Sequence, residues 1–130
     1  MSYLSKDEQI LIKISKHLNK LNTLYSSIVN LTDTEIDDGI EGLALTQCIT
    51  NLFELSSRID NDDVLERLSM LSSGRVARVR NIASHDYDSI NWSIIKNICR
   101  KILSSITIDV INELLDDINK SKKVNKQYNQ

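Results

Sequence analysis

Apolar residues in the first half of the chain form two stripes at helical spacing. In each stripe they recur at steps of three and four, which places them on one face of an amphipathic helix. The first stripe consists of Leu11, Ile14, Leu18, Leu21, Tyr25 and Ile28, and the second of Leu45, Cys48, Leu52, Leu55 and Ile59. The intervening segment 31–34 supplies threonine and aspartate side chains that can cap a helix. We therefore expect helices over about residues 6–30 and 35–59, paired as an antiparallel hairpin.

A third helical segment is expected in the middle of the chain. The acidic turn 60–63 suits a helix start, because carboxylates favour the positive N-terminal end of a helix. An apolar face follows, formed by Val64, Leu65, Leu68 and Leu71. Gly74 can break this helix or only kink it, since a lone glycine costs about 1 kcal/mol relative to alanine. We expect helical structure to resume at Arg75 and to end near Ser84.

The last helix, expected over about residues 90–119, carries a wider apolar surface. Asp88 or Ser89 can serve as its N-cap. One apolar row contains Ile94, Ile98, Ile102, Ile106, Val110, Leu114 and Ile118, and its neighbour contains Ile95, Cys99, Leu103, Ile111 and Leu115. Two adjacent rows exceed what one helix contact requires, which predicts packing against a second subunit in a homodimer. The lysine-bearing segment 120–130 is expected to be a disordered tail outside the 1–119 domain.

Composition narrows the fold and the function classes. A chain of 130 residues with no proline and three glycines favours a single all-α domain, an up-down bundle of four to five helices. The net charge of −2 argues against a protein that coats nucleic acid by bulk charge. Cys48 and Cys99 have no partner at metal-ligand spacing and are expected to be reduced core residues. No leader peptide or membrane-spanning apolar run is visible, so we expect a cytoplasmic protein with no membrane partner.

One octapeptide carries the residue types of a catalytic site. Residues 80–87 read Arg-Asn-Ile-Ala-Ser-His-Asp-Tyr, so four residues separate Arg80 from His85, and Tyr87 follows two positions later. An arginine fork suits phosphate oxygens, and a histidine transfers protons near neutral pH. Such a pair can cleave a phosphodiester without a metal, although a histidine at a helix end can also simply interact with free carbonyl groups. His17 lies in a polar run and is expected on the surface.

The motif resembles that of the HEPN superfamily, and within it the HepT-like branch of small all-helical proteins. The resemblance implies that Arg80 and His85 are the catalytic residues of a ribonuclease and that Asn81 supports them. It also implies a composite site lined by both subunits of a homodimer. A partner nucleotidyltransferase antitoxin would AMPylate the Tyr87 hydroxyl, adding negative charge beside the cations that bind RNA. Without such a partner, Tyr87 is simply a packing group at a helix end.

Helix geometry sets a condition on this site. At about 100° per residue, Arg80 and His85 would project about 140° apart on an ideal helix. They converge only if the helix ends at His85 or if a second subunit supplies the other partner. The implied chemistry is attack of a ribose 2′-hydroxyl on the adjacent phosphate, with His85 moving the proton and Arg80 stabilising the developing charge. It requires no metal and no cofactor.

Basic residues gather around the motif. Arg75, Arg78, Lys96 and Arg100 are candidates for binding RNA phosphates, and the alternative is a solvated face paired with nearby acids. Trp92, in the first turn of the last helix, is expected to pack, although an indole can also stack on bases.

With the resemblance, the sequence predicts a metal-independent endoribonuclease toxin that acts on cellular RNA and is neutralised by a nucleotidyltransferase antitoxin. The alternative is a non-catalytic helical module that binds a nucleotide or a nucleotidyltransferase. A purely structural helical dimer is the simplest interpretation of the periodicity alone.

Overall fold

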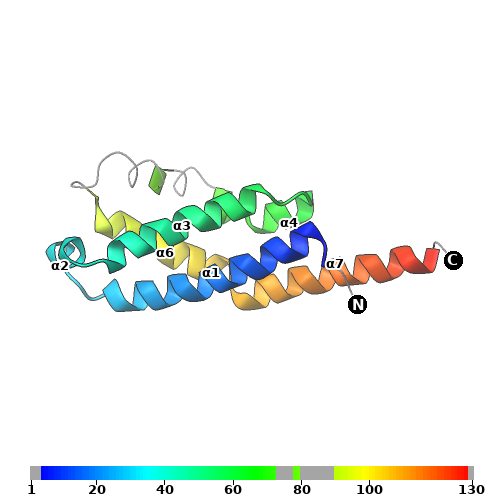
Figure 1. Ribbon diagram of the computed structural model, residues 1–130, viewed down its shortest axis with the longest axis horizontal. Helices are drawn as coiled ribbons and strands as arrows, with labels where there is room; N and C mark the ends of the chain where they lie inside the picture. The colour runs from blue at the N-terminus through cyan, green and yellow to red at the C-terminus, as the bar shows by residue number, and fades with distance from the viewer. Residues whose placement is uncertain (1–3, 73–77, 80–89, 129–130) are drawn as a thin grey trace.

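The computed structural model describes residues 4–72, 78–79 and 90–128 of the chain, and in these residues every regular element is helical (Figure 1). The α-helices are α1 (Lys6–Ile28), α2 (Asp33–Asp38), α3 (Glu41–Ser57), α4 (Asp62–Arg67), α6 (Trp92–Ser105) and α7 (Ile108–Tyr128), and the 3₁₀ helix η1 spans Ser69–Ser72. The all-α prediction is confirmed. The homodimer remains a prediction.

Helices α1 and α3 form the expected antiparallel hairpin, which runs the length of the bundle in Figure 1. Their apolar stripes face each other and are buried, apart from a partly exposed Tyr25. The Cys48 thiol donates a 3.2 Å hydrogen bond to the carbonyl of His17 across the interface. At the far end, the Asp7 carboxylate accepts the backbone N–H groups of Asp60 and Asn61 at 3.0 Å. The start of α1 is thereby joined to the turn that follows α3.

The expected second helix over residues 35–59 is divided into α2 and α3, which corrects the sequence prediction. A capping box between Thr32 and Glu35 starts α2 close to the end of α1. The helix then stops at Gly39, whose backbone is extended, with φ −104° and ψ 175°. Because an extended residue ends the helical hydrogen-bond pattern, α3 begins anew at Glu41.

The expected last helix over residues 90–119 is also divided, into α6 and α7. Ile106 leaves the helical conformation (φ −120°, ψ 85°) while its side chain remains 1% exposed in the core. The Thr107 hydroxyl then accepts the backbone N–H of Val110 at 3.2 Å, as an N-cap does. Helix α7 continues past the expected end near Asn119 to Tyr128 and extends beyond the rest of the bundle in Figure 1.

The start of α6 is anchored in the core by Trp92, which is 3% exposed. Asn91 caps this helix, since its side-chain oxygen accepts the backbone N–H groups of Ser93 and Ile94; the expected caps Asp88 and Ser89 lie outside the described residues. A Cβ added at Gly42 would lie 2.6 Å from the Trp92 ring, so α3 provides a glycine where the indole approaches its backbone. The packing expected for Trp92 is confirmed.

Candidate functional site

A cleft of about 550 Å³ opens along one flank of α6. It is lined by Arg78, Val79, Ser93, Ile94, Asn97, Ile98, Arg100 and Lys101. One wall comes from residues 78–79, which are helical, and the other from α6. We call this feature the α6 cleft.

Helical periodicity sorts the lining of the α6 cleft into two rows. Residues four apart lie one above another on a helix. The polar row consists of Ser93, Asn97 and Lys101, and the apolar strip consists of Ile94 and Ile98 on α6 together with Val79 from the facing wall. Val79 and Ile98 are buried, whereas Ile94 is 47% exposed and leaves aliphatic surface open to a ligand.

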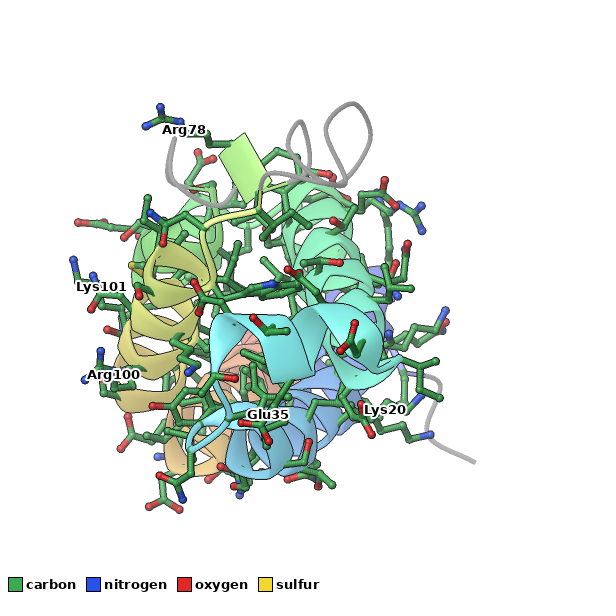
Figure 2. The ribbon with its side chains drawn as sticks, turned by 90° about the vertical axis from the view of Figure 1, so that its left-hand side faces the viewer. Lys20, Glu35, Arg78, Arg100 and Lys101 are labelled. Carbon is green, nitrogen blue, oxygen red and sulfur yellow. The ribbon has the colours of Figure 1, made fainter. Side chains whose placement is uncertain are left out.

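Three of the lining side chains are cationic. In Figure 2, Arg78, Lys101 and Arg100 lie along the same flank of the molecule, whereas Lys20 lies on the opposite one. Among the described residues, no carboxylate forms an ion pair with any of these three cleft cations. Cations beside an apolar strip favour an anionic ligand that also has apolar surface, such as a nucleotide.

The structure places only part of the predicted site. Arg78 and Arg100 line the α6 cleft, although Lys96 does not. The Lys96 ammonium instead donates a 2.9 Å hydrogen bond to the carbonyl of Leu31, which fastens the loop before α2 to α6. The other predicted residues, namely Arg75, Arg80, Asn81, His85 and Tyr87, lie outside the described residues.

Chain connectivity nevertheless relates the motif to the α6 cleft. Val79, which lines the cleft, immediately precedes Arg80, and Ile90 follows the motif three residues before the cleft residue Ser93. Val79 and Ile90 are 1% and 8% exposed, so buried residues hold the chain on both sides of the segment 80–89. The motif segment therefore connects the two walls of the cleft along the chain.

Sequence reasoning did not identify Ser93, Asn97 and Lys101 as residues of the site. Their spacing of four residues was a readable signal for a common helix face. Lys96 lies about 100° around the helix from Asn97, which explains why it faces the α1–α2 loop instead.

Of the two histidines, only His17 lies within the described residues. His17, expected on the surface, is partly exposed on α1, and its Nδ1 pairs with the carbonyl of Lys13 at 2.9 Å. It borders a hollow of only about 150 Å³ with Asn51, Glu54, Leu55 and Arg58. His17 is therefore separate from the α6 cleft, which it does not line.

Both cysteines are buried and free, as expected. Burial raises the pKa of the Cys48 thiol to about 11 and that of Cys99 to about 12, so both are protonated at neutral pH. In the described parts of the chain, no group of histidine, cysteine and carboxylate side chains could hold a metal ion. No described helix combines the length and apolarity needed to cross a membrane.

A family model described as "Ribonuclease HepT-like" matches residues 14–123. The match spans both walls of the α6 cleft and the motif between them. No curated protein and no solved structure matches the chain.

Proposed function

Since the chain belongs to the HepT-like ribonuclease family, we propose that it is a metal-independent endoribonuclease toxin with its active site at the Arg80–His85 motif. The observation that carries this proposal is the α6 cleft. Its cations suit RNA phosphates, and one of its walls continues directly into Arg80. Family membership supports a nuclease role in general, and the cleft supports this particular location.

The proposed reaction uses the RNA's own 2′-hydroxyl as the nucleophile. His85 removes the hydroxyl proton as the 2′-oxygen attacks the adjacent phosphorus. The bond to the 5′-oxygen breaks, and that oxygen takes up a proton, leaving a 2′,3′-cyclic phosphate and a 5′-hydroxyl. Arg80 stabilises the charge on the phosphate oxygens during attack, and Asn81 orients His85 or the phosphate. DNA resists this reaction because it lacks the nucleophile.

The proposal includes a homodimer and a regulator. Motif residues of both subunits line one composite site, which resolves the angular separation of Arg80 and His85 on an ideal helix. Arg75, Arg78 and Arg100 contribute positive charge for RNA binding in the cytoplasm. A nucleotidyltransferase antitoxin AMPylates Tyr87, and the added phosphates compete with RNA for these cations.

A comparison of the two histidines tests the catalytic proposal. His85→Ala should lower the cleavage rate of a labelled RNA by at least about 100-fold, because it removes the proton-transfer group. His17→Ala, the matched control on α1, should leave the rate unchanged. Cleavage by the unmodified protein should persist in EDTA and should yield cyclic phosphate ends. Unimpaired cleavage by His85→Ala, or full dependence on a divalent metal, would instead favour the non-catalytic module.

A further inference from the structure

Ile94 is the unusual residue of the α6 cleft. It lies in the first turn of α6 and is 47% exposed, although its neighbours Ile95 and Ile98 are 1% and 2% exposed. Exposed aliphatic surface is unfavourable in water, and a ligand that covers it gains free energy. A bare phosphate would satisfy the cleft cations and leave Ile94 uncovered. The lining therefore suits a ligand that has an apolar face as well as negative charge.

Asn97 adds a group that can distinguish ligands. Its side chain is exposed in the polar row, and among the described residues its amide has no hydrogen-bond partner. A carboxamide offers both a donor and an acceptor, so it can pair with the edge of a nucleobase. Along α6 it lies between the exposed Ile94 and the two cations Arg100 and Lys101, one turn before Lys101.

The size and chemistry of the α6 cleft favour an unpaired nucleotide over a duplex. A cleft of about 550 Å³ matches the usual range for a small-molecule ligand. In an A-form duplex the base faces are stacked on each other and the major groove is too narrow for side chains. A duplex would therefore offer its phosphates to the cations but no base face to Ile94.

We propose that the α6 cleft binds one unpaired nucleotide of an RNA strand and selects its base. The base lies on the apolar strip at Ile94, its edge pairs with Asn97, and the flanking phosphates contact Arg78, Arg100 and Lys101. This inference rests on the ribonuclease function proposed above and adds the strand form and the residues that determine specificity.

Fluorescence anisotropy tests whether the cleft prefers single-stranded RNA and whether Ile94 contacts it. The full chain carries His85→Ala, so that the RNA probe is not cleaved during the measurement. The probes are a fluorescein-labelled single-stranded RNA of about 12 nucleotides and a blunt duplex of the same sequence. The single strand should bind at least about 10-fold more tightly than the duplex.

Adding Ile94→Ala should weaken binding of the single strand roughly 3- to 10-fold. Ile40→Ala, a control at a side chain that is 78% exposed outside the cleft, should have no effect. Equal binding of both probes, or equal effects of both substitutions, would overturn the proposal.

Base selection is measured by the differences in affinity among RNA homopolymers, and phosphate binding by the salt dependence of affinity. Asn97→Ala should reduce the differences in affinity among oligo(A), oligo(C), oligo(G) and oligo(U) while leaving the salt dependence unchanged. Arg100→Ala should weaken all four alike and lower the slope of log affinity against log salt by about 0.7. Lys20→Ala removes an equal charge from the opposite flank and should not change the slope (Figure 2). An Asn97 variant with unaltered base preference would refute the assigned role of that residue.

The two proposals fail in different ways. If the unmodified protein does not cleave RNA but the binding pattern holds, the ribonuclease proposal is wrong and the nucleotide-binding cleft stands. If cleavage depends on His85 while the Ile94 and Asn97 variants bind and cleave like the Ile40 control, the cleft proposal alone is wrong.

Discussion

The indole Nε1–H of Trp92 donates a 2.7 Å hydrogen bond to Oδ1 of Asp37. Trp92 is the first residue of α6 and Asp37 belongs to α2, so this bond joins segments 55 positions apart in the sequence. It holds the N-terminal end of α6, where Ser93 and Ile94 line the α6 cleft. The acidic helix α2 thus contributes to the geometry of a site that it does not line.

Asp37→Ala should therefore lower the free energy of unfolding by about 1–2 kcal/mol, because it leaves a buried indole N–H without its acceptor. Trp92→Ala should cost about 3–5 kcal/mol, since it also creates a cavity. Asp38→Ala is the control, because that neighbouring side chain is exposed like Asp37 but forms no side-chain hydrogen bond within the described residues. Urea unfolding at neutral pH measures all three. Equal stability of the Asp37 and Asp38 variants would show that the hydrogen bond contributes nothing measurable.

Gly42→Ala should lower stability by about 1–3 kcal/mol through overpacking. The new Cβ would lie 2.6 Å from the Trp92 ring and 2.7 Å from Ile36 Cγ2, and both of these side chains are buried. At Gly39 the close atom is Glu41 Oε2, the end of a flexible side chain at 2.5 Å, so Gly39→Ala should cost much less. A thermal melt compares the pair, and the prediction fails if Gly39→Ala is the more damaging change.

The composite site predicts complementation between inactive variants. If Arg80 of one subunit acts with His85 of the other, a mixture of the Arg80→Ala and His85→Ala proteins contains mixed dimers with one intact site. Random exchange of subunits should restore roughly a quarter of the activity of the unmodified protein. Each variant alone should be inactive in the same RNA cleavage assay. No recovery after unfolding and refolding the two chains together would place each site within a single subunit.

Tyr87 is the predicted point of regulation. Co-expression with the cognate nucleotidyltransferase should add AMP mass to the peptide that contains Tyr87, as detected by mass spectrometry. Tyr87→Phe should still cleave RNA but escape neutralisation, because the acceptor hydroxyl is gone. Tyr25→Phe, on α1, is the control and should remain sensitive. Neutralisation of Tyr87→Phe without any mass addition would indicate steric blocking by the partner.

Cys99 should make the fold sensitive to alkaline pH. Its thiol is fully buried, and burial raises its pKa from 9.0 to about 12. The unfolded chain loses this proton first, so the stability due to the neutral thiol is complete below about pH 9 and is lost as the pH rises toward about 12. Between about pH 8 and pH 10.5 this loss amounts to about 2 kcal/mol.

Cys99→Ala supplies the comparison for this pH effect. The variant should start from lower stability, because truncation leaves a cavity, but should lose less on going to alkaline pH. Urea unfolding at the two pH values measures the difference. Identical losses in both proteins would mean that Cys99 ionises equally easily in the folded and unfolded states.

Several features were readable from the sequence because they depend on residues close together in the chain. The stripes that contain Leu11 and Leu45 set the α1–α3 hairpin, since apolar residues three and four apart share a helix face. Cys48 and Cys99 were recognisable as core thiols for the same reason. The spacing between Arg80 and His85 can also be read from the sequence alone, whereas the relative position of their side chains cannot.

Tertiary structure decided what depends on partners distant in the sequence. From the sequence, Lys96 looked like a member of the basic cluster, but its side chain bonds to the Leu31 carbonyl and therefore faces the α1–α2 loop. Likewise, the break at Ile106 interrupts a row whose apolar period continues unbroken. The α6 cleft forms only when Val79 and α6 are both held in place. Helix α6 is held by the Trp92–Asp37 hydrogen bond and by the close packing of the Trp92 ring against the backbone at Gly42. Such contacts depend on three-dimensional packing, which a one-dimensional period does not encode.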